Sequence, residues 1–272
     1  MMISVVVVTY NSGRTLKETL DSIYEQTYKD IELIISDDGS TDDTLKISKE
    51  WMDFHVARFS KIQLIESENT GVTLNCNRGI FAASGDYIQI IAGDDILLPE
   101  ALDTKVNYAK KYNLKVVFCK TEPFGDNLEK VEKMKSFCER GYEIISLGYE
   151  SQRAAILVDN YIAGPSGGFY NAEFIKSIKG YDEQYPMLED YPFIFHFLYM
   201  GYEIRMLDMV LSKYRISDGS LCMKTGSPMT ESYIKFFFRE RLAEMLKEKK
   251  FYLAVQHTVK FVRKFLLLKL GA

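Results

Sequence analysis

The chain has 272 residues, of which 47% are hydrophobic and 26% are charged, and its formal net charge is −4. This length and apolar content suffice for a complete α/β core with a smaller appended unit. Acidic residues outnumber basic ones, 38 to 34, and no recognition motif is present, so we expect no nucleic-acid partner.

The start of the chain and its cysteines indicate a cytoplasmic protein. Residues 1–4 lack the basic region of a signal peptide, and the apolar run that follows is too short to span a membrane. The four cysteines show no zinc-like spacing, which is typical of free thiols in a reducing compartment.

A short β-branched or apolar run followed by a helical periodicity occurs three times in the first 85 residues. The strand-like runs are 3–8, 31–36 and 62–65, and a fourth run follows at 87–92. Alternation of strands and helices predicts a mainly parallel sheet covered on both faces. Residues 120–140 are charged and poor in apolar periodicity, so we expect a surface excursion there.

Polar residues follow each predicted strand of this half. In parallel sheets, ligands bind beyond the carboxyl ends of the strands, so four polar loops are expected to converge on one crevice. These loops are Thr9-Tyr10-Asn11, Asp37-Asp38, Asn69-Thr70-Gly71 and Asp94-Asp95.

The adjacent carboxylates of Asp94 and Asp95 point to a divalent cation. Their mutual repulsion at the end of a buried strand has to be offset, and Mg²⁺ or Mn²⁺ binds one or two carboxylates together with substrate phosphates. The alternative is that the pair caps the helix suggested at 99–102.

Several ordered motifs resemble those of family 2 glycosyltransferases, whose fold is the GT-A nucleotide-diphospho-sugar fold. The resemblance is dense over residues 3–110 and continues more thinly through Leu188-Glu189-Asp190 to Tyr214-Arg215. The motifs are Val7-Val8-Thr9-Tyr10-Asn11, Ser22-Ile23-Tyr24-Glu25-Gln26-Thr27, Ile34-Ile35-Ser36-Asp37-Asp38-Gly39-Ser40-Thr41-Asp42, Asn69-Thr70-Gly71 with Asn77-Arg78-Gly79, and Gly93-Asp94-Asp95.

The resemblance implies a UDP-sugar donor. Tyr10 would lie against the uracil, Asp38 would accept a hydrogen bond from its imide, and Asp94 would lie near the ribose. Asp95 would hold a metal, Mn²⁺ or Mg²⁺, on the diphosphate. The other implied donor-site residues are Thr9, Asn11, Asn69, Gly71 and Arg78.

Each of these residues also has an ordinary structural interpretation. One aspartate of Asp37-Asp38 can close a turn and cap the next helix. Asn69 and Gly71 are common turn residues, and Arg78 can be a solvated helix arginine.

Glu189-Asp190 is the expected catalytic segment. The resemblance makes Asp190 the base that takes the proton of the acceptor hydroxyl, and a single base predicts one displacement with inversion. The alternative is an acidic first turn of the helix at 191–200, where the helix dipole favours negative charge. The Gly-rich segment with Gly167 and Gly168, together with Glu189, is assigned to the acceptor or donor-sugar loop.

One position departs from the family pattern. Many relatives carry a His after the Tyr-Arg strand, whereas Tyr214-Arg215-Ile216 is followed here by Ser217. Metal binding would then rest on Asp95 and the diphosphate, which implies a weak, substrate-dependent site.

We expect a catalytic domain at 1–225 and a C-terminal helical extension at 226–272. Residues 1–110 would bind the nucleotide-sugar and 111–225 the acceptor. The transferred group would be a hexose or N-acetylhexosamine, and the acceptor a lipid-linked oligosaccharide, a glycoprotein glycan or a growing polysaccharide. Two alternatives are a nucleotidyltransferase and a non-catalytic nucleotide-sugar or carbohydrate-binding module.

The C-terminal segment differs in charge from the rest of the chain. From 247 to 272, seven basic residues and one acid give a formal +6, which leaves −10 for the remainder of a chain that totals −4. Such a basic amphipathic helix suits peripheral binding at the inner face of a membrane, or docking on a second copy or on the catalytic domain. The acidic remainder favours docking, so we expect a homo-oligomer. The apolar face predicted from helical spacing is Phe251, Val255, Val259, Val262, Leu266 and Leu270, with Gln256, Lys260, Arg263 and Lys264 opposite.

Overall fold

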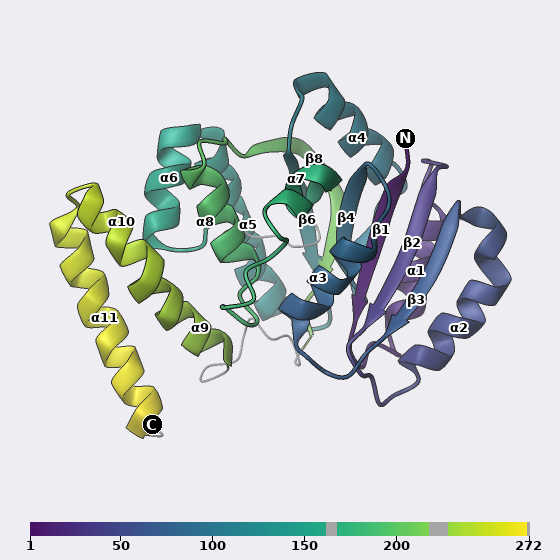
Figure 1. Ribbon diagram of the computed structural model, residues 1–272, viewed down its shortest axis with the longest axis horizontal. Coiled ribbons are helices and arrows are strands. Elements are labelled where there is room, and N and C mark those ends of the chain that lie inside the picture. The colour runs from purple at the N-terminus through teal and green to yellow at the C-terminus, as the bar shows by residue number, and fades with distance from the viewer. Residues whose placement is uncertain (162–167, 218–227, 271–272) are drawn as a thin grey trace.

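The computed structural model describes residues 1–161, 168–217 and 228–270. Within these residues the chain forms an eight-stranded mixed sheet with helices on both faces and a helical C-terminal region (Figure 1). The α/β fold predicted from the sequence is confirmed.

Eight strands lie in the spatial order β3-β2-β1-β4-β7-β6-β8-β5. In chain order they are β1 (Ile3–Thr9), β2 (Ile31–Asp37), β3 (Lys61–Glu66), β4 (Tyr87–Ala92), β5 (Ile96–Leu97), β6 (Val116–Phe124), β7 (Phe169–Asn171) and β8 (Arg205–Arg215).

The helices alternate with the strands in the first half of the chain and cluster in the second. The α-helices are α1 (Leu16–Tyr24), α2 (Thr44–His55), α3 (Val72–Ala82), α4 (Ala101–Tyr112), α5 (Leu128–Ser146), α6 (Tyr149–Val158), α7 (Ala172–Ser177), α8 (Asp190–Tyr199), α9 (Pro228–Phe236), α10 (Leu242–Lys247) and α11 (Phe251–Leu270). A 3₁₀ turn, η1 (Val56–Arg58), follows α2, and a π-helical turn, η4 (Phe237–Arg241), joins α9 to α10.

The four strands expected from the first half are parallel neighbours. β1 pairs with β2 and with β4, and β2 pairs with β3, all in parallel register. Both faces of β1 are buried: Val5 and Val7 pack in the layer of α1, α2 and α4, whereas Val6 packs in the layer of α3. The carboxyl ends of these strands therefore meet at one edge of the sheet.

The prediction of a surface excursion at residues 120–140 is wrong. This segment contains the end of β6 and most of α5, and α5 packs on β6. Val131, Cys138 and Ile145 lie seven residues apart and are buried, so they form one stripe facing the core. The many charges belong to the solvent side of the helix and hide this spacing.

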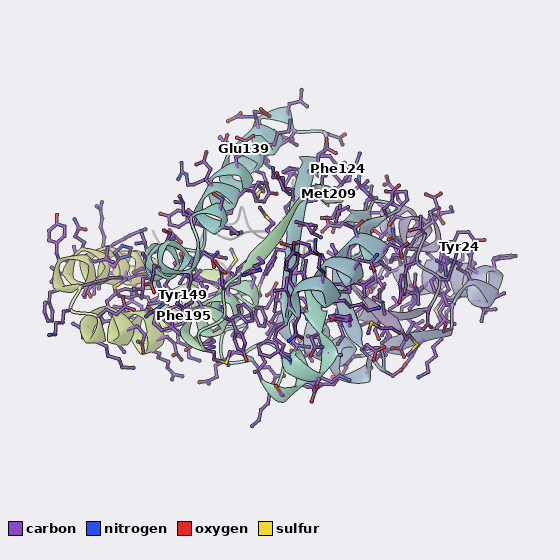
Figure 2. All side chains as sticks on the ribbon, turned by 90° about the horizontal axis from the view of Figure 1, so that it is seen from above. Tyr24, Phe124, Glu139, Tyr149, Phe195 and Met209 are labelled. Carbon is purple, nitrogen blue, oxygen red and sulfur yellow. The ribbon has the colours of Figure 1, made fainter. Side chains whose placement is uncertain are left out.

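The C-terminal helices pack beside α6 and α8, at the opposite end of the molecule from α1 and α2. Figure 2 shows Tyr149 of α6 and Phe195 of α8 on the side of these helices, with Tyr24 far from them. The ring of Phe195 lies edge-on to Phe236, with 5.3 Å between centroids. Phe261 of α11 stacks on Phe237 with 4.4 Å between centroids. Aromatic contacts therefore join the C-terminal helices to the rest of the fold.

Candidate active site

Asp37, the last residue of β2, is buried and ties the ends of β1 and β2 together. Its Oδ2 accepts hydrogen bonds from Thr9 Oγ1 at 2.8 Å and from Ser40 Oγ at 2.6 Å. Its Oδ1 accepts one from the Ser40 backbone N–H at 2.9 Å. Asp37 therefore has the turn-closing role that the sequence analysis left open for one member of the Asp37-Asp38 pair.

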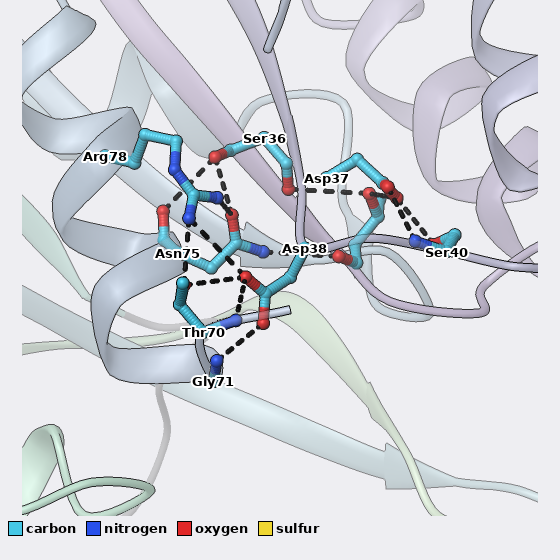
Figure 3. A network of polar contacts seen from close by, with 9 residues as sticks. Ser36, Asp37, Asp38, Ser40, Thr70, Gly71, Asn75 and Arg78 are labelled. Atoms are coloured by element: carbon cyan, nitrogen blue, oxygen red, sulfur yellow. Dashed lines mark hydrogen bonds and ion pairs between the residues drawn. The ribbon is translucent and has the colours of Figure 1, made fainter. Parts of the chain in front are cut away.

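Asp38 is also buried, and it holds the loop before α3 (Figure 3). Its Oδ1 accepts hydrogen bonds from the Thr70 backbone N–H at 3.0 Å and from Thr70 Oγ1 at 2.9 Å, and its Oδ2 accepts one from the Gly71 N–H at 2.7 Å. Arg78 Nη2 lies 3.5 Å from Oδ1. Arg78 Nη1 also donates to Asn75 Oδ1 at 3.0 Å, so this arginine is fixed beside Asp38 and is not a freely solvated side chain.

Two glycines allow these loops to approach each other closely. Gly39 has a φ of +77°, and a Cβ there would lie 2.9 Å from the Asn69 backbone nitrogen. A Cβ on Gly93 would lie 2.9 Å from Thr9 Cγ2. The ends of β1, β2 and β4 and the loop after β3 therefore lie together, as the sequence predicts.

Tyr10 and Asn11 project from the end of β1. The Tyr10 side chain is 52% exposed, so its ring has an accessible face. Asn11 adopts a left-handed φ of 51°, its backbone N–H donates to Ser40 Oγ at 2.8 Å, and its Oδ1 accepts from the Thr41 N–H at 2.8 Å. Asn11 therefore fastens the loop after β1 to the loop after β2 and leaves Tyr10 at the surface.

The Asp94-Asp95 pair follows β4 and is held by Arg215 at the end of β8. Asp95 is fully buried, and its Oδ1 accepts from the Arg215 backbone N–H at 2.9 Å. The Arg215 side chain donates from Nε to the Asp94 carbonyl at 2.8 Å and forms an ion pair with Glu18 of α1. Burial raises the pKa of the Asp94 carboxyl, and the Arg215 charge only partly offsets this.

This donor set fits a divalent cation that shares its ligands with a phosphate group. The raised pKa of Asp94 shows that its negative charge is not fully compensated by the protein. Among the described residues, no group of three or more His, Cys, Asp or Glu side chains could hold a metal ion by itself. Mg²⁺ and Mn²⁺ bind through few carboxylates and complete their shell with water and phosphate oxygens.

Asp190 begins α8, and its carboxylate is oriented by two hydrogen bonds. Oδ1 accepts from the Tyr191 backbone N–H at 2.7 Å, and Oδ2 accepts from Asn160 Nδ2 at 3.0 Å. Burial raises the pKa of Asp190, and the hydrogen bond from Asn160 lowers it. A carboxylate with a raised pKa is a stronger base than an exposed one.

Glu189 stands beside Asp190 in a different environment. Burial, with the negative charge of Asp190, raises the pKa of Glu189 to about 7. Its Oε2 atom is buried and has no hydrogen-bond partner within the described parts of the chain. Near neutral pH, Glu189 therefore holds a proton for much of the time.

We expect Glu189→Gln to be more stable than the wild type above pH 7 and of similar stability below pH 4.5. The unfolded carboxyl ionises near 4.5 and the folded one near 7, so wild-type stability falls as pH rises through that interval. The amide side chain of the Glu189→Gln variant does not titrate, so it contributes no such dependence of stability on pH. Thermal melts of both proteins from pH 4.5 to 8.5 measure this, and a difference that does not change with pH would contradict it.

Helix α3 connects this acidic pair to the loops around Asp38. Thr73, in its first turn, hydrogen-bonds to Glu189, and Thr73 Oγ1 accepts from the Met187 N–H at 3.0 Å. Burial raises the pKa of the Cys76 thiol in α3, and the negative charges of Glu189 and Asp38 raise it further. Glu189 therefore lies near the first turn of α3, the helix that contacts Asp38 through Arg78.

The C-terminal region supports the segment that carries Asn160. Buried Arg241 donates from Nε to the Leu157 carbonyl at 3.0 Å, and its guanidinium lies 5.1 Å from the centre of the Tyr191 ring. Tyr233 of α9 donates a hydrogen bond to Asp159, the neighbour of Asn160. These contacts hold the residues that adjoin Asn160 and Asp190 in the sequence.

The model of the family described as Glycosyl transferase family 2 matches residues 4–178, which include the loops that follow β1, β2, β3 and β4 and end before Glu189. The chain belongs to glycosyl transferase family 2. Glycosyltransferase GlyG of Streptococcus pneumoniae serotype 4 is 37% identical over 117 residues, which cover 43% of this chain and 38% of GlyG. The chain spans between 34% and 39% of the length of the first curated relatives that it matches.

Two solved structures share the fold at low sequence identity. S. aureus TarS 1-349 in complex with UDP-GlcNAc aligns with a TM-score of 0.65 at 20% identity, over 90% of this chain and 67% of that one. The mannosyltransferase PcManGT from Pyrobaculum calidifontis in complex with GDP-Man and Mn²⁺ aligns with a TM-score of 0.63 at 18% identity, over 90% of this chain and 64% of that one. The fold of this family 2 chain is therefore the GT-A fold.

The structure places the predicted residues in two groups. The first surrounds the ends of β1, β2 and β4; the second is Glu189 and Asp190 at the start of α8. Gly168 immediately precedes β7, and Gly167 lies outside the described residues. The members of the first group are Thr9, Tyr10, Asn11, Asp38, Asn69, Gly71, Arg78, Asp94 and Asp95.

Two residues of the site were not predicted as functional. Arg215 was noticed only as part of a Tyr-Arg pattern, and its position at the end of a long strand was the available signal. Asn160 belongs to no sequence motif, and its contact with Asp190 spans 30 residues. Asn160 and Asp190 come together only in the folded chain.

Proposed function

We propose that this family 2 chain is an inverting glycosyltransferase that uses a UDP-sugar and a divalent cation, Mn²⁺ or Mg²⁺. It transfers a hexose or N-acetylhexosamine to a hydroxyl of a glycan acceptor. The observation that carries the proposal is the Asp190 carboxylate, oriented by Asn160 and adjacent to Glu189, whose charge reaches Cys76 of α3 together with that of Asp38.

The nucleotide side of the proposal rests on Tyr10, Asp38 and the Asp94-Asp95 pair. Tyr10 offers an exposed ring for stacking, and Asp38 Oδ2 accepts only from Gly71 among the described residues, so it can accept one more hydrogen bond. A uracil imide is such a donor. TarS in complex with UDP-GlcNAc and PcManGT in complex with GDP-Man and Mn²⁺ support a nucleotide-sugar and a metal.

The proposed reaction needs one base and a stabilised leaving group. Asp190 takes the proton of the acceptor hydroxyl as that oxygen attacks the anomeric carbon. Asp95 would hold the cation, which supplies positive charge to the leaving diphosphate when bound, and Asp94 would lie near the ribose. A single displacement inverts the anomeric configuration, so an α-linked donor gives a β-linked product. Residues 1–110 would form the donor half and 111–225 the acceptor half.

A screen of UDP-sugars for UDP release tests the proposal. We expect release with Mn²⁺ or Mg²⁺ and none with chelator, and we expect an added glycan acceptor to accelerate it. Family membership favours glycosyl transfer over nucleotidyl transfer, which would release pyrophosphate from a nucleoside triphosphate. Binding of a UDP-sugar without any UDP release would instead identify a binding module.

Asp38→Ala is expected to weaken UDP binding by about 1–3 kcal/mol, because the uracil imide would lose its acceptor. Asp38 also holds Thr70 and Gly71, so a loss of affinity alone does not separate recognition from loop structure. Calorimetry with UDP and with N3-methyl-UDP, which lacks the imide proton, makes the separation. The wild type should prefer UDP, and the variant should bind both ligands equally.

Thr70→Val is the matched control for the loop. It removes the Oγ1 donor to Asp38 and keeps the carboxylate, so preference for UDP over N3-methyl-UDP should persist. If Asp38→Ala retains the full preference for UDP, Asp38 does not contact the base.

A further inference from the structure

Helix α11 presents three distinct sides. One side packs on the protein through Ala254 and Phe261, which are 3% and 1% exposed. A second side carries the exposed basic residues Lys260 and Arg263. Between them runs a third side, here called the apolar stripe, whose members are 42–77% exposed: Phe251, Tyr252, Val255, Val259, Val262 and Leu266.

The apolar stripe contains Tyr252 and all of the apolar face predicted from helical spacing except Leu270. It is exposed because the helix packs through the side of Ala254, His257 and Phe261, where Phe261 stacks on Phe237 and lies under Arg241. Large apolar side chains that line up at one side of a helix and remain exposed mark an interaction surface. In Figure 1, α11 forms one extremity of the molecule, so this surface is sterically accessible.

The charges beside the stripe select its partner. Residues 251–270 include four basic residues and no Asp or Glu. Lys260 and Arg263 have no ion pair within the described part of the chain. Arg263, four residues after Val259, lies at the edge of the stripe, and Lys260 lies further round the helix on the same side as Arg263. A helix with an exposed apolar side bordered by Lys and Arg matches a surface that is apolar inside and anionic at its boundary.

We propose that α11 binds the surface of an anionic lipid bilayer, lying parallel to it with the apolar stripe inserted among the acyl chains. None of the described helices is long and apolar enough to cross a membrane, so the contact is interfacial. The inference concerns the surface of α11 and does not depend on the proposed reaction.

A second copy of the chain fits this surface less well. Two stripes facing each other would bring Lys260 and Arg263 of both copies together, and α11 offers no acidic residue to pair with them. An anionic bilayer instead offers negative charges that attract Lys260 and Arg263.

A groove extends the apolar surface toward the acidic pair. It has a volume of about 760 Å³, and its apolar walls include Val262 and Phe265 of α11, Ile234 of α9, Phe238 of η4, and Pro186. Its polar walls are Gln184, Glu231, Ser232 and Lys235. Pro186 precedes Glu189 by three residues, and its carbonyl accepts from Ser232 Oγ at 2.7 Å. The groove therefore reaches from α11 to the loop that leads into Glu189-Asp190.

The test is sedimentation of the full chain with vesicles of phosphatidylcholine, with and without phosphatidylglycerol. We expect the wild type to bind only the anionic vesicles and to dissociate as salt increases. Val255→Glu with Val259→Glu should lose binding by at least about tenfold, because two charges replace the inserted side chains. Lys260→Gln with Arg263→Gln should also weaken it by about tenfold or more, and should reduce its salt dependence.

The matched control is Phe54→Glu with Val56→Glu, at the other end of the molecule. Both residues are exposed, at 85% and 54%, so the control makes the same charge change on exposed apolar positions. It should bind vesicles as the wild type does. The α11 variants should keep the wild-type melting temperature, since Glu favours a helix at least as well as Val and the packed side is untouched.

Light scattering tests the alternative that the apolar stripe binds a second copy of the chain. If the wild type is a dimer in solution, becomes a monomer in the Val255→Glu, Val259→Glu variant, and does not sediment with anionic vesicles, the stripe binds a second copy and the proposal is wrong. Equal sedimentation of the wild type and that variant would also overturn it.

Discussion

Asp190→Asn is expected to reduce transfer at least about a hundredfold and to leave donor affinity within about threefold of the wild type. General-base catalysis contributes two to four orders of magnitude, and the amide cannot accept the acceptor proton. The amide oxygen can still accept the Tyr191 N–H, so the start of α8 should keep its geometry. Transfer rates together with calorimetry of UDP-sugar binding measure both effects. A collapse of donor affinity would assign Asp190 a structural role.

Asn160→Ala separates the base from the group that orients it. The hydrogen bond from Asn160 lowers the pKa of Asp190, so removing it should raise that pKa. Because the base must be ionised, the acidic limb of the pH–rate profile should move to higher pH, and much of the rate should return in alkaline buffer. An equal loss at every pH would mean that Asn160 only supports the fold.

The donor half of the fold is readable from the sequence because its information is local. Each of the first strands is a short apolar run, buried on both faces, and each ends in a polar turn such as Asp37-Asp38-Gly39. Parallel pairing then brings the ends of these strands to one edge whatever the details of packing. The meeting of these loops follows from that rule.

The second half depends on contacts that no local pattern contains. The charged surface of α5 hid its buried stripe, and residues 120–140 were mistaken for a surface segment. The helical spacing of α11 shows which apolar side chains share a face, but not which side of the helix packs on the protein. That side contains Ala254 and Phe261, because Phe261 contacts Phe237 and Arg241. Asn160 reaches Asp190 only through the packing of α6 against α8.

Asp95→Asn is expected to reduce metal-dependent UDP release by about a hundredfold or more. The leaving diphosphate would lose the positive charge that the cation supplies, and a single carboxylate change is enough because the described residues hold no larger ligand cluster. Asn can still accept the Arg215 N–H, which Asp95 Oδ1 accepts at 2.9 Å, so the variant should fold. Rates of UDP release against Mn²⁺ concentration measure the effect.

The binding of Mn²⁺ itself provides a readout that does not require turnover. With few protein ligands, Mn²⁺ should bind the wild type weakly alone and much more tightly with UDP, whose phosphates complete the coordination shell. Asp95→Asn should remove this cooperation between Mn²⁺ and UDP, whereas Glu18→Gln, which only breaks the ion pair to Arg215, should preserve it. Undiminished UDP release by Asp95→Asn at saturating Mn²⁺ would refute the assignment of Asp95 to the metal, and the buried Asp95 would then serve only to anchor the end of β8.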